Sequence, residues 1–209
     1  MGPAEDQHPE EPVEIALVGD LSDQESDITE KLLSVPAEGE CVLYFNSPGG
    51  SAYTAISLMS VMLLRGLQAT GIVTGECSSA ALWPFGACQR RLVHPGSVLL
   101  FHPMKWQSEE HVGLAEAAEW SRHFGYLEAD MDQRLARLLG VSDAQLREWM
   151  QPGRYLTGPE LVAAGCAQSL VSEGEDRFPQ LAENARGLYR DMHVAGDDAP
   201  ASAGPLLVG

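Results

Sequence analysis

Short apolar runs alternate with longer amphipathic stretches along the first half of the chain. Ile15–Val18, Val42–Phe45, Gly71–Thr74 and Ser97–Phe101 each stop at a glycine or a polar residue and are rich in β-branched or aromatic side chains, which predicts strands. The last two runs have the continuous apolar character of strands that are covered on both faces. A final strand is predicted near Ala167–Val171.

Capping residues predict three helices that begin at defined positions. Ser22-x-x-Glu25 and Thr157-x-x-Glu160 have the spacing of a capping box, in which each side chain satisfies a backbone N–H group of the other residue. Ser142 is expected to cap a further short helix, which a Gln-Pro-Gly sequence then ends. The predicted helices are 22–35, 142–150 and 157–165.

The residues between the second and third predicted strands have helical spacing. A helix is expected from Ser51 to Leu64, with Ile56, Met59 and Leu63 on one face. Strand, helix and strand then form a βαβ unit, for which a right-handed crossover is expected. The alternation of the two kinds of element predicts a layered α/β fold.

A much longer helix is predicted from about Leu114 to Leu139. Apolar side chains recur in it at steps of three and four residues and form a stripe about 40 Å long at the usual helical rise. The positions are Trp120, Phe124, Leu127, Met131, Leu135 and Leu138. Because a small domain seldom needs so long a stripe, we expect part of the helix to reach beyond the core; the other interpretation is an internal core helix.

The 209-residue chain is strongly acidic. It contains 13 Lys and Arg against 30 Asp and Glu, a formal net charge of −17, which argues against binding nucleic acid or an anionic membrane. Part of this charge lies in a polar leader, residues 1–12, which we expect to be disordered and which lacks the layout of a signal peptide. No apolar run has the length of a membrane span, so we expect a cytoplasmic protein.

The domain organisation follows from these patterns. We expect one folded domain over residues 13–173 and a C-terminal extension over residues 174–209. The segment Pro179–His193 has helical spacing, and the small, acidic remainder is expected to be disordered.

Cysteine and histidine positions predict no metal site and no cofactor. Cys41, Cys77, Cys88 and Cys166 lack a metal-ligand spacing and lie among apolar or small residues, so we expect them to be reduced and buried. Cys77 is a secondary candidate for a thiol nucleophile because it lies two residues before Ser79.

Candidate chemistry lies where the predicted strand Gly71–Thr74 turns into a helix of small residues that starts at Ser79. Such a strand-to-helix corner presents a side chain and backbone N–H groups in one place. A serine hydroxyl needs a base within hydrogen-bond distance to act as a nucleophile, and His102 directly follows the strand Ser97–Phe101. The spacing alone is equally compatible with a structural role for Ser79 and with His102 as a histidine of the core.

Three separate motifs carry a family resemblance. Asn-Ser-Pro-Gly-Gly-Ser at 46–51, Gly-x-x-x-Ser-Ala-Ala at 75–81 and Leu-x-x-His-Pro at 99–103 resemble, in order and spacing, the ClpP family of serine peptidases. The likeness runs over about residues 13–171. It implies a ClpP/crotonase-like spiral of βαβ units with a protruding strand-helix handle.

The resemblance also implies roles for individual residues. Ser79 corresponds to the nucleophile and His102 to the general base. The backbone amides of Gly49 or Gly50 and of Ala80 correspond to the oxyanion hole, a role that needs no side chain.

One family position departs from the pattern. The third catalytic residue of the family is an aspartate directly before an Arg-aromatic-Leu-Ser/Thr segment; here that segment is 154–157 and the preceding residue is Gly153. Loss of the orienting aspartate lowers turnover about 10⁴-fold in other serine proteases. A slow enzyme, an enzyme with a substitute orienting group and an inactive relative therefore all stay open.

Several groups are candidates for the missing partner of His102. Glu148, Glu109 and Glu110 lie in the same general neighbourhood, and Gly153 leaves room for a water or a backbone carbonyl to accept the imidazole N–H. Lys105 is a weaker candidate, as the base of a Ser-Lys arrangement.

The resemblance further implies an assembly and its partners. The substrate is expected to be a peptide or an unfolded protein, and the long helix is expected to join homo-oligomeric stacked rings that enclose the active sites in a chamber. An AAA+ ATPase partner is implied too, although the leader before Val13 lacks the apolar character of the family's axial entrance.

Two other functions compete with a peptidase. A non-catalytic ring subunit would keep the fold and lose the triad, which the glycine at 153 fits. An acyl-CoA enzyme of the crotonase superfamily would share the spiral core and the paired-amide oxyanion hole. Such enzymes lack the Ser–His pair and usually bind the nucleotide through basic residues, which are sparse here.

Overall fold

The structure is a computed structural model that describes residues 12–107 and 111–170. The expectations for the leader 1–11, for residues 108–110, and for the C-terminal extension lie outside these residues, as does Val171 at the end of the last predicted strand.

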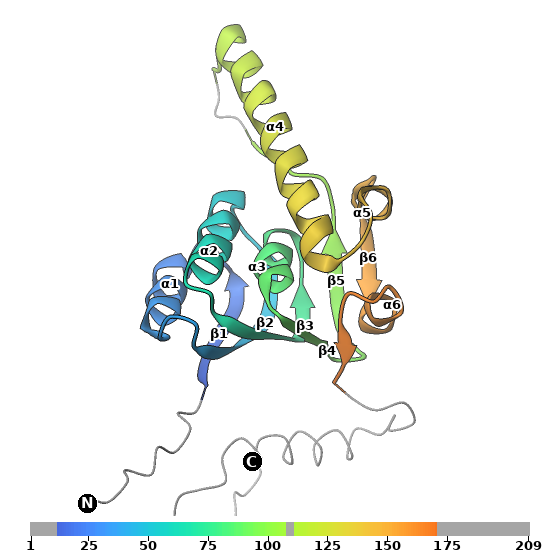
Figure 1. Ribbon diagram of the computed structural model, residues 1–209. Helices are drawn as coiled ribbons and strands as arrows, with labels where there is room; N and C mark the ends of the chain where they lie inside the picture. Colours follow the sequence, from blue (N-terminus) through green and yellow to red (C-terminus); the bar gives the residue numbers. More distant parts are fainter. Residues whose placement is uncertain (1–11, 108–110, 171–209) are drawn as a thin grey trace, which may run out of the picture. The chain divides into compact units, whose positions relative to one another are not determined.

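A parallel sheet forms the centre of the described domain (Figure 1). Its strands are β1 (Val13–Asp20), β2 (Glu40–Gly49), β3 (Gln68–Cys77), β4 (Arg90–Val93) and β7 (Gln168–Ser169), in that spatial order and all parallel. The three apolar runs predicted in this region are therefore confirmed as strands, although each strand extends beyond its apolar centre.

Two more strands leave the sheet at the end of β3. β5 (Val98–Phe101) pairs with β3 in parallel where Val98 meets Glu76, and it pairs antiparallel with β6 (Arg154–Thr157). This side branch places β5 beside the end of β3. The residues that follow β5 therefore lie near the corner that follows β3.

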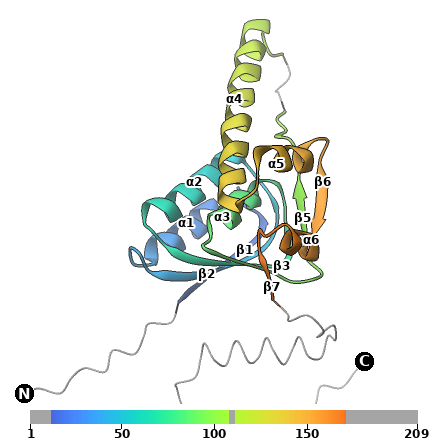
Figure 2. The ribbon, with the colours of Figure 1, turned by 45° about the vertical axis from the view of Figure 1, so that its right-hand side comes forward.

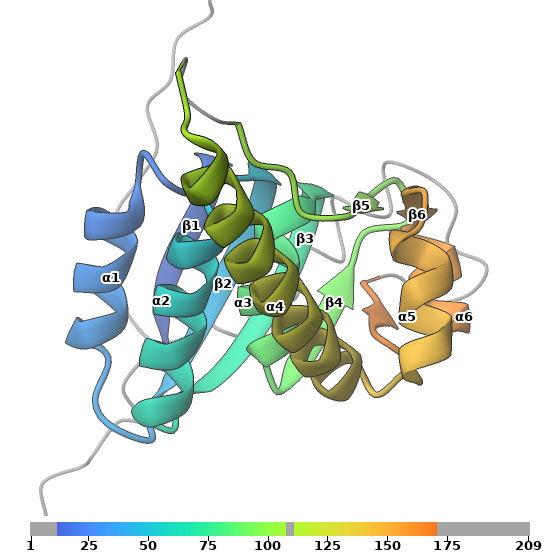
Figure 3. The same cartoon turned by 90° about the horizontal axis from the view of Figure 1, so that it is seen from above.

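Helices fill the crossovers between the parallel strands. α1 (Glu25–Ser34), α2 (Ala52–Leu64) and α3 (Leu82–Ala87) pack along one face of the sheet (Figures 1 and 3). The alternation of helices with parallel strands confirms the α/β class. Pro84 falls in the first turn of α3, where its missing N–H has no helical partner to lose.

Aromatic side chains mark two parts of the core. Phe45 of β2 meets Phe85 of α3 with ring centroids 5.5 Å apart and planes at 79°. Phe101 of β5 meets Trp149 of α5 (Asp143–Met150) at 5.1 Å. The second contact fixes α5 against the strand that ends at His102.

The second faces of β3 and β5 are only partly covered, contrary to the sequence-based expectation. Val73 and Leu99 are fully buried, but Ile72 and Leu100 are half-buried and Val98 is 37% exposed. The helices cover one face, so burial alternates along these strands despite their continuous apolar sequence.

The start of α1 also differs from the prediction. The helix begins at Glu25 after Gln24, which makes no capping hydrogen bond with its side chain. Ser22 Oγ instead accepts a hydrogen bond from Ser51 N at 2.8 Å, and the Glu25 carboxylate accepts one from Thr54 Oγ1 at 2.7 Å. Both residues of the predicted capping box thus connect α1 to α2.

α2 has the predicted bounds but a different buried face. Of the predicted residues, Met59 is buried, Ile56 is half-buried and Leu63 is 52% exposed. The helix is apolar on most sides, so its sequence does not single out one face. The buried residues are Thr54, Ala55, Leu58, Met59 and Met62.

The two predicted caps in the second half of the domain are confirmed. Ser142 Oγ accepts a hydrogen bond from Gln145 N at 3.1 Å and opens α5. Thr157 and Glu160 form a complete capping box at α6 (Gly158–Ala163).

The long helix α4 (Leu114–Leu139) has the predicted bounds and protrudes from the sheet (Figures 1 and 2). Met131, Leu135 and Leu139 in its last turns are buried, whereas Leu114 at its start is 90% exposed. Trp83 Nε1 of α3 donates a hydrogen bond to Met131 O at 2.9 Å and anchors α4 to the core.

The connection into α4 has no strand within residues 102–107 and 111–113. Across the described ranges, no helix combines the length and apolar character needed to cross a membrane.

Candidate active site

The corner after β3 holds Ser79 in a strained backbone conformation. Ser79 opens a short 3₁₀ turn, Ser79–Ala81, with a φ of 53°, a region that residues other than glycine seldom adopt. Ser78 N donates to Ser47 O at 3.0 Å, and Ala81 N donates to Ser78 O at 3.0 Å, so backbone hydrogen bonds hold the corner on both sides of Ser79. Strain that the surroundings maintain in this way is concentrated at functional sites.

Gly49 at the end of β2 packs directly against this corner. Its φ is 109°, and a Cβ atom there would lie 2.8 Å from Ala80 N, from Ser78 O and from Ser79 Cβ. A side chain at this position would therefore cover the Ala80 amide, which only glycine leaves open.

The three amides that the sequence suggests for an oxyanion hole differ in their hydrogen bonds. Gly49 N donates to Ser47 Oγ at 3.1 Å and is already satisfied. Within residues 12–107 and 111–170, no hydrogen bond uses the amides of Gly50 or Ala80. These two N–H groups are available to an incoming oxygen atom, and Gly49 contributes by its lack of a side chain.

His102 follows β5 and is half-buried. Its Nδ1 lies 2.6 Å from Pro103 O. A carbonyl oxygen only accepts hydrogen bonds, so Nδ1 carries the hydrogen and Nε2 is the basic nitrogen of the neutral ring. A general base of the serine-protease type needs this tautomer.

A hydrogen bond between neighbours brings the two candidate residues into one region. Leu100 N of β5 donates to Ser78 Oγ at 3.2 Å. Ser79 directly follows the acceptor, and His102 lies two residues after the donor, on the same side of the extended chain. Among the described residues, neither the Ser79 hydroxyl nor His102 Nε2 makes a hydrogen bond. Catalytic hydrogen bonds often tighten only when substrate binds.

Gly153 lies against His102, where the family resemblance places the third triad residue. Its φ is 128°, and a Cβ atom there would lie 3.3 Å from His102 Cβ and 3.4 Å from Phe101 O. A side chain at this position would therefore contact the histidine closely, from a positive-φ conformation that residues other than glycine seldom adopt.

The other candidate partners of His102 have different surroundings. Glu148 is exposed and lies 3.9 Å from Arg154, with no hydrogen bond to His102 among the described residues. Lys105 is exposed in the connection after His102. Glu109 and Glu110 lie outside the described residues. The backbone carbonyl of Pro103 takes the imidazole N–H, one of the possibilities that the glycine had suggested.

The cysteines lie in surroundings that disfavour the thiolate. All four are free and buried, which confirms the sequence-based interpretation. Cys77 is fully buried, and this burial raises the pKa of its thiol well above the ordinary value. A buried neutral thiol is a poor nucleophile compared with a thiolate.

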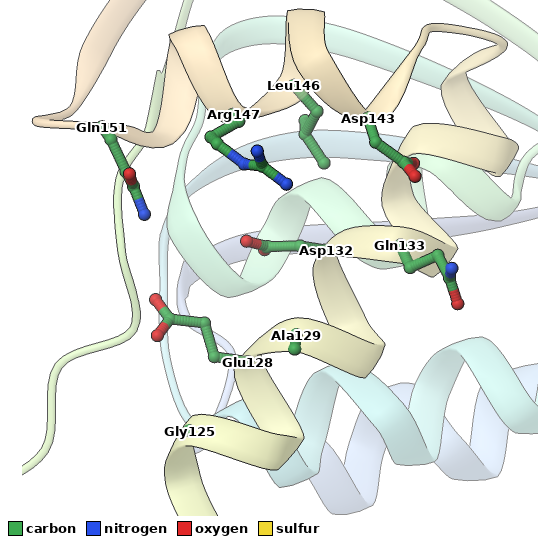
Figure 4. A pocket seen from close by; sticks show the side chains of 9 residues that line it. All are labelled: Gly125, Glu128, Ala129, Asp132, Gln133, Asp143, Leu146, Arg147 and Gln151. Atoms are coloured by element: carbon green, nitrogen blue, oxygen red, sulfur yellow. The ribbon is translucent and has the colours of Figure 1, made fainter.

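One polar contact beside His102 was not foreseen from the sequence. Met104 N donates a hydrogen bond at 2.8 Å to Oε1 of Glu128, a residue of α4 that lies 24 positions further along the chain. Glu128 belongs to the wall of a pocket of about 310 Å³ between α4 and α5 (Figure 4). An acidic residue on an amphipathic helix carries no sequence signal that distinguishes it from a solvated charge.

Comparison with models of known families identifies a match that covers most of the chain. The model described as Clp protease matches residues 11–174, a range that includes the Gly49–Gly50, Ser79 and His102 positions. A comparison with curated proteins gives no match.

Proposed function

Because the chain belongs to the Clp protease family, we propose that it is a serine peptidase in which Ser79 is the nucleophile and His102 the general base. The observation that carries this proposal is the corner at Ser79. A strained serine with a φ of 53° lies beside the Ala80 amide, which Gly49 leaves uncovered. That combination suits acyl transfer, which needs a nucleophile and oxyanion donors in one place.

The proposed reaction begins with a proton transfer. His102 Nε2 takes the proton of the Ser79 hydroxyl while Oγ forms a bond to the carbonyl carbon of the peptide. The carbonyl oxygen gains the negative charge, and the C–N bond then breaks as the imidazolium returns the proton to the leaving amine. Water repeats the sequence on the acyl-enzyme and restores Ser79.

The developing oxyanion is assigned to the amides of Gly50 and Ala80. Both N–H groups lie outside the hydrogen bonds of the described residues, whereas the Gly49 amide is bonded to Ser47 Oγ. Removal of one donor from such a site costs about 10²–10³-fold in turnover in a well-studied hydrolase.

We also propose that the protein works as a homo-oligomer on peptides or unfolded proteins. The protruding α4, with Leu114 90% exposed at its start, offers a surface for contact between subunits. Stacked rings with a closed chamber and an AAA+ ATPase partner are further proposals, which rest on family membership alone.

A fluorophosphonate probe tests the assignment of Ser79. Wild-type protein is expected to form a covalent phosphonyl adduct on Ser79, and Ser79→Ala is expected to lose it. Ser60→Ala is a matched control, because Ser60 is a half-buried serine of α2 to which the proposal assigns no role. Intact mass and peptide mapping identify the modified residue.

The same experiment decides between the competing functions. Equal labelling of Ser79→Ala would refute the nucleophile assignment. Wild-type protein that assembles but resists the probe would support the non-catalytic ring subunit. Turnover of an acyl-CoA thioester that survives in Ser79→Ala would instead favour the crotonase-type alternative.

A further inference from the structure

A single peptide group links His102 to a carboxylate on another element. The carbonyl oxygen of Pro103 lies 2.6 Å from His102 Nδ1, and the N–H group of Met104 donates to Glu128 Oε1 at 2.8 Å. These two atoms belong to the same amide, the Pro103–Met104 peptide. The chain therefore contains a continuous sequence of contacts from the carboxylate through one amide to the imidazole.

An amide that is bonded at both ends is a better acceptor than one bonded at a single end. Negative charge beside the N–H shifts electron density toward the carbonyl oxygen, and such cooperativity strengthens each bond by about 10–30% in condensed-phase estimates. The contacts fix the orientation of the amide as well, because the N–H and the C=O of a trans peptide point in opposite directions. Both effects favour the imidazole with hydrogen on Nδ1.

The surrounding packing holds both ends of this arrangement. Glu128 is half-buried on the part of α4 that approaches the core, and the next turn is anchored by the hydrogen bond from Trp83 to Met131. Two residues beyond Met104, the Trp106 ring stacks on Phe124 of α4 with centroids 5.3 Å apart. The segment after His102 is thus held along α4 at Met104 and at Trp106.

The charged groups around Glu128 come from α4 and α5. Figure 4 shows Asp132 and Glu128 of α4 and Arg147 of α5 on the walls of one pocket. Burial, together with the charge of Glu128, raises the pKa of Asp132 to about 6. Asp143 of α5 also lines the pocket, whereas the contact with Met104 is specific to Glu128.

We propose that Glu128 is a positioning residue that acts on His102 through the Pro103–Met104 peptide and takes over the orienting role of the missing triad aspartate. We call these contacts, from Glu128 through the Pro103–Met104 peptide to His102, the relay. No proton moves along the relay; the carboxylate fixes the tautomer of His102 and stabilises the imidazolium that forms during catalysis. The inference rests on the proposed peptidase function, since it assigns His102 as the base. It is consistent with a glycine at position 153, which has no carboxylate to offer to the imidazole.

Three variants separate the relay from general effects of charge. Glu128→Ala removes the acceptor and the charge, and Glu128→Gln keeps an acceptor oxygen for Met104 N but removes the charge. Asp132→Asn is the matched control, one helical turn away in the same pocket without the contact to Met104. Circular dichroism and thermal melting verify that each protein is folded.

Rates of fluorophosphonate reaction across pH give the first readout. Loss of an orienting group normally costs turnover, up to about 10⁴-fold for a direct aspartate, so we expect a smaller loss of about 10–100-fold for Glu128→Ala. Glu128→Gln is expected to fall between Glu128→Ala and wild type, and Asp132→Asn within about twofold of wild type. The carboxylate favours the imidazolium, so the acid limb of the profile is expected to move to lower pH in both Glu128 variants.

The separate effects of Glu128→Ala on kcat and KM distinguish a residue that positions His102 from one that only supports the fold. With a peptide substrate, kcat is expected to fall in Glu128→Ala while KM changes little, because the relay acts on charge that develops in the transition state. A purely structural role would lower the plateau rate without moving the acid limb. That outcome, or an effect of Asp132→Asn as large as that of Glu128→Gln, would overturn the relay.

A measurement that needs no turnover separates this inference from the proposed function. In ¹⁵N-histidine-labelled protein, the His102 signals of wild type are expected to report hydrogen on Nδ1, and the fraction of that tautomer is expected to fall in Glu128→Ala. If Glu128→Ala changes neither the tautomer of His102 nor the midpoint of the acid limb of the pH profile, the relay is rejected even if the enzyme is active. If wild-type protein resists the probe and Glu128→Ala still lowers the fraction of that tautomer, the peptidase proposal is rejected, and only the effect of Glu128 on the His102 tautomer stands.

Discussion

At the scale of single residues, a backbone carbonyl contacts His102, whereas the histidine of a serine-protease triad is held by a carboxylate side chain. The imidazole is bonded to the carbonyl of the very next residue, Pro103, at 2.6 Å. A neutral carbonyl fixes the tautomer but stabilises a positive ring less than a carboxylate does. In the proposed mechanism, a second group beyond the carbonyl, Glu128, is therefore expected to strengthen His102 as a base.

Restoring the family aspartate at position 153 is expected to fail. Gly153 has a φ of 128°, and a Cβ would lie 3.3 Å from His102 Cβ, so Gly153→Asp introduces backbone strain and crowding. We expect a loss of about 1–3 kcal/mol in the free energy of unfolding, and no gain in probe reaction. Urea denaturation and labelling rates measure the two quantities.

Gly165→Asp is a matched control for this substitution. Gly165 has a φ of 76° with nothing within 4 Å of a Cβ, so the variant adds left-handed strain without crowding. It should cost less stability than Gly153→Asp. Faster labelling of Gly153→Asp than of wild type would show that the position accepts a working carboxylate.

Asp132 is expected to make stability depend on pH. Burial, with a contribution from the charge of Glu128, raises its pKa from 3.8 to about 6 in the folded protein. The folded state thus binds the proton more tightly than the unfolded state, and the stability from Asp132 is present below pH 3.8 and is lost as pH rises through about 6. Asp132→Asn should therefore stabilise the protein at pH 7.5, by roughly 1 kcal/mol after allowance for solvent screening.

Urea denaturation at two pH values measures this effect. The difference between Asp132→Asn and wild type should be larger at pH 7.5 than at pH 4.5, because the wild-type carboxylate is mostly neutral in the folded protein at the lower value. An equal difference at both pH values would show that Asp132 does not carry a raised pKa.

At the scale of elements, the connection after β5 and the helix α4 form one packed unit. Trp106 stacks on Phe124 at 5.3 Å and meets Trp120 edge-on at 5.6 Å. Tyr53 Oη of α2 lies 2.8 Å from His123 Nε2, and this second contact steadies α4 beyond its anchor on the core. The position of α4 therefore bears directly on the segment that contains His102.

Trp106→Ala is expected to loosen this segment. Loss of the two ring contacts should cost about 1–2 kcal/mol of local stability. Amide hydrogen exchange should become faster at residues 103–107, and turnover should fall because the Pro103–Met104 peptide is less well held. Tyr126→Ala is the control, since Tyr126 is a 74% exposed aromatic residue of the same helix. Unchanged exchange in Trp106→Ala would mean that the aromatic contacts do not hold the connection.

At the scale of the whole molecule, the protruding α4 and the high negative charge are expected to have opposite effects on the proposed assembly. The helix presents Leu114 with 90% exposure, while the chain carries a formal net charge of −17. Like charges on approaching subunits repel over a Debye length of about 8 Å at physiological ionic strength. Salt is therefore expected to favour the oligomer.

Light scattering after size-exclusion chromatography tests this expectation. Leu114→Asp should lower the assembled mass, because it places a charge on a surface expected to be buried between subunits. Glu116→Gln, at an exposed position on the same turn, should not lower it. A wild-type protein that is monomeric at all protein and salt concentrations would reject the assembly proposal.

The sequence predicted those structural features that are determined by residues close together in the chain. The bounds of α4, the caps of α5 and α6 at Ser142 and Thr157, and the corner at Ser79 all follow from local spacing and turn chemistry. It did not predict the buried face of α2, because several faces of that helix are apolar and only the neighbouring elements select one. The polar groups of Ser22 and Glu25 were likewise free to bond within α1 or across to α2.

By itself, the sequence determined the α/β class, the order of its elements and the positions of Ser79 and His102 at the ends of their strands, because periodicity and chain breaks encode these locally. Only the tertiary structure decided what holds the imidazole. The Pro103–Met104 peptide and Glu128 meet because α4 packs back along the connection in one orientation. A contact between residues 24 positions apart depends on that packing, which no local pattern specifies.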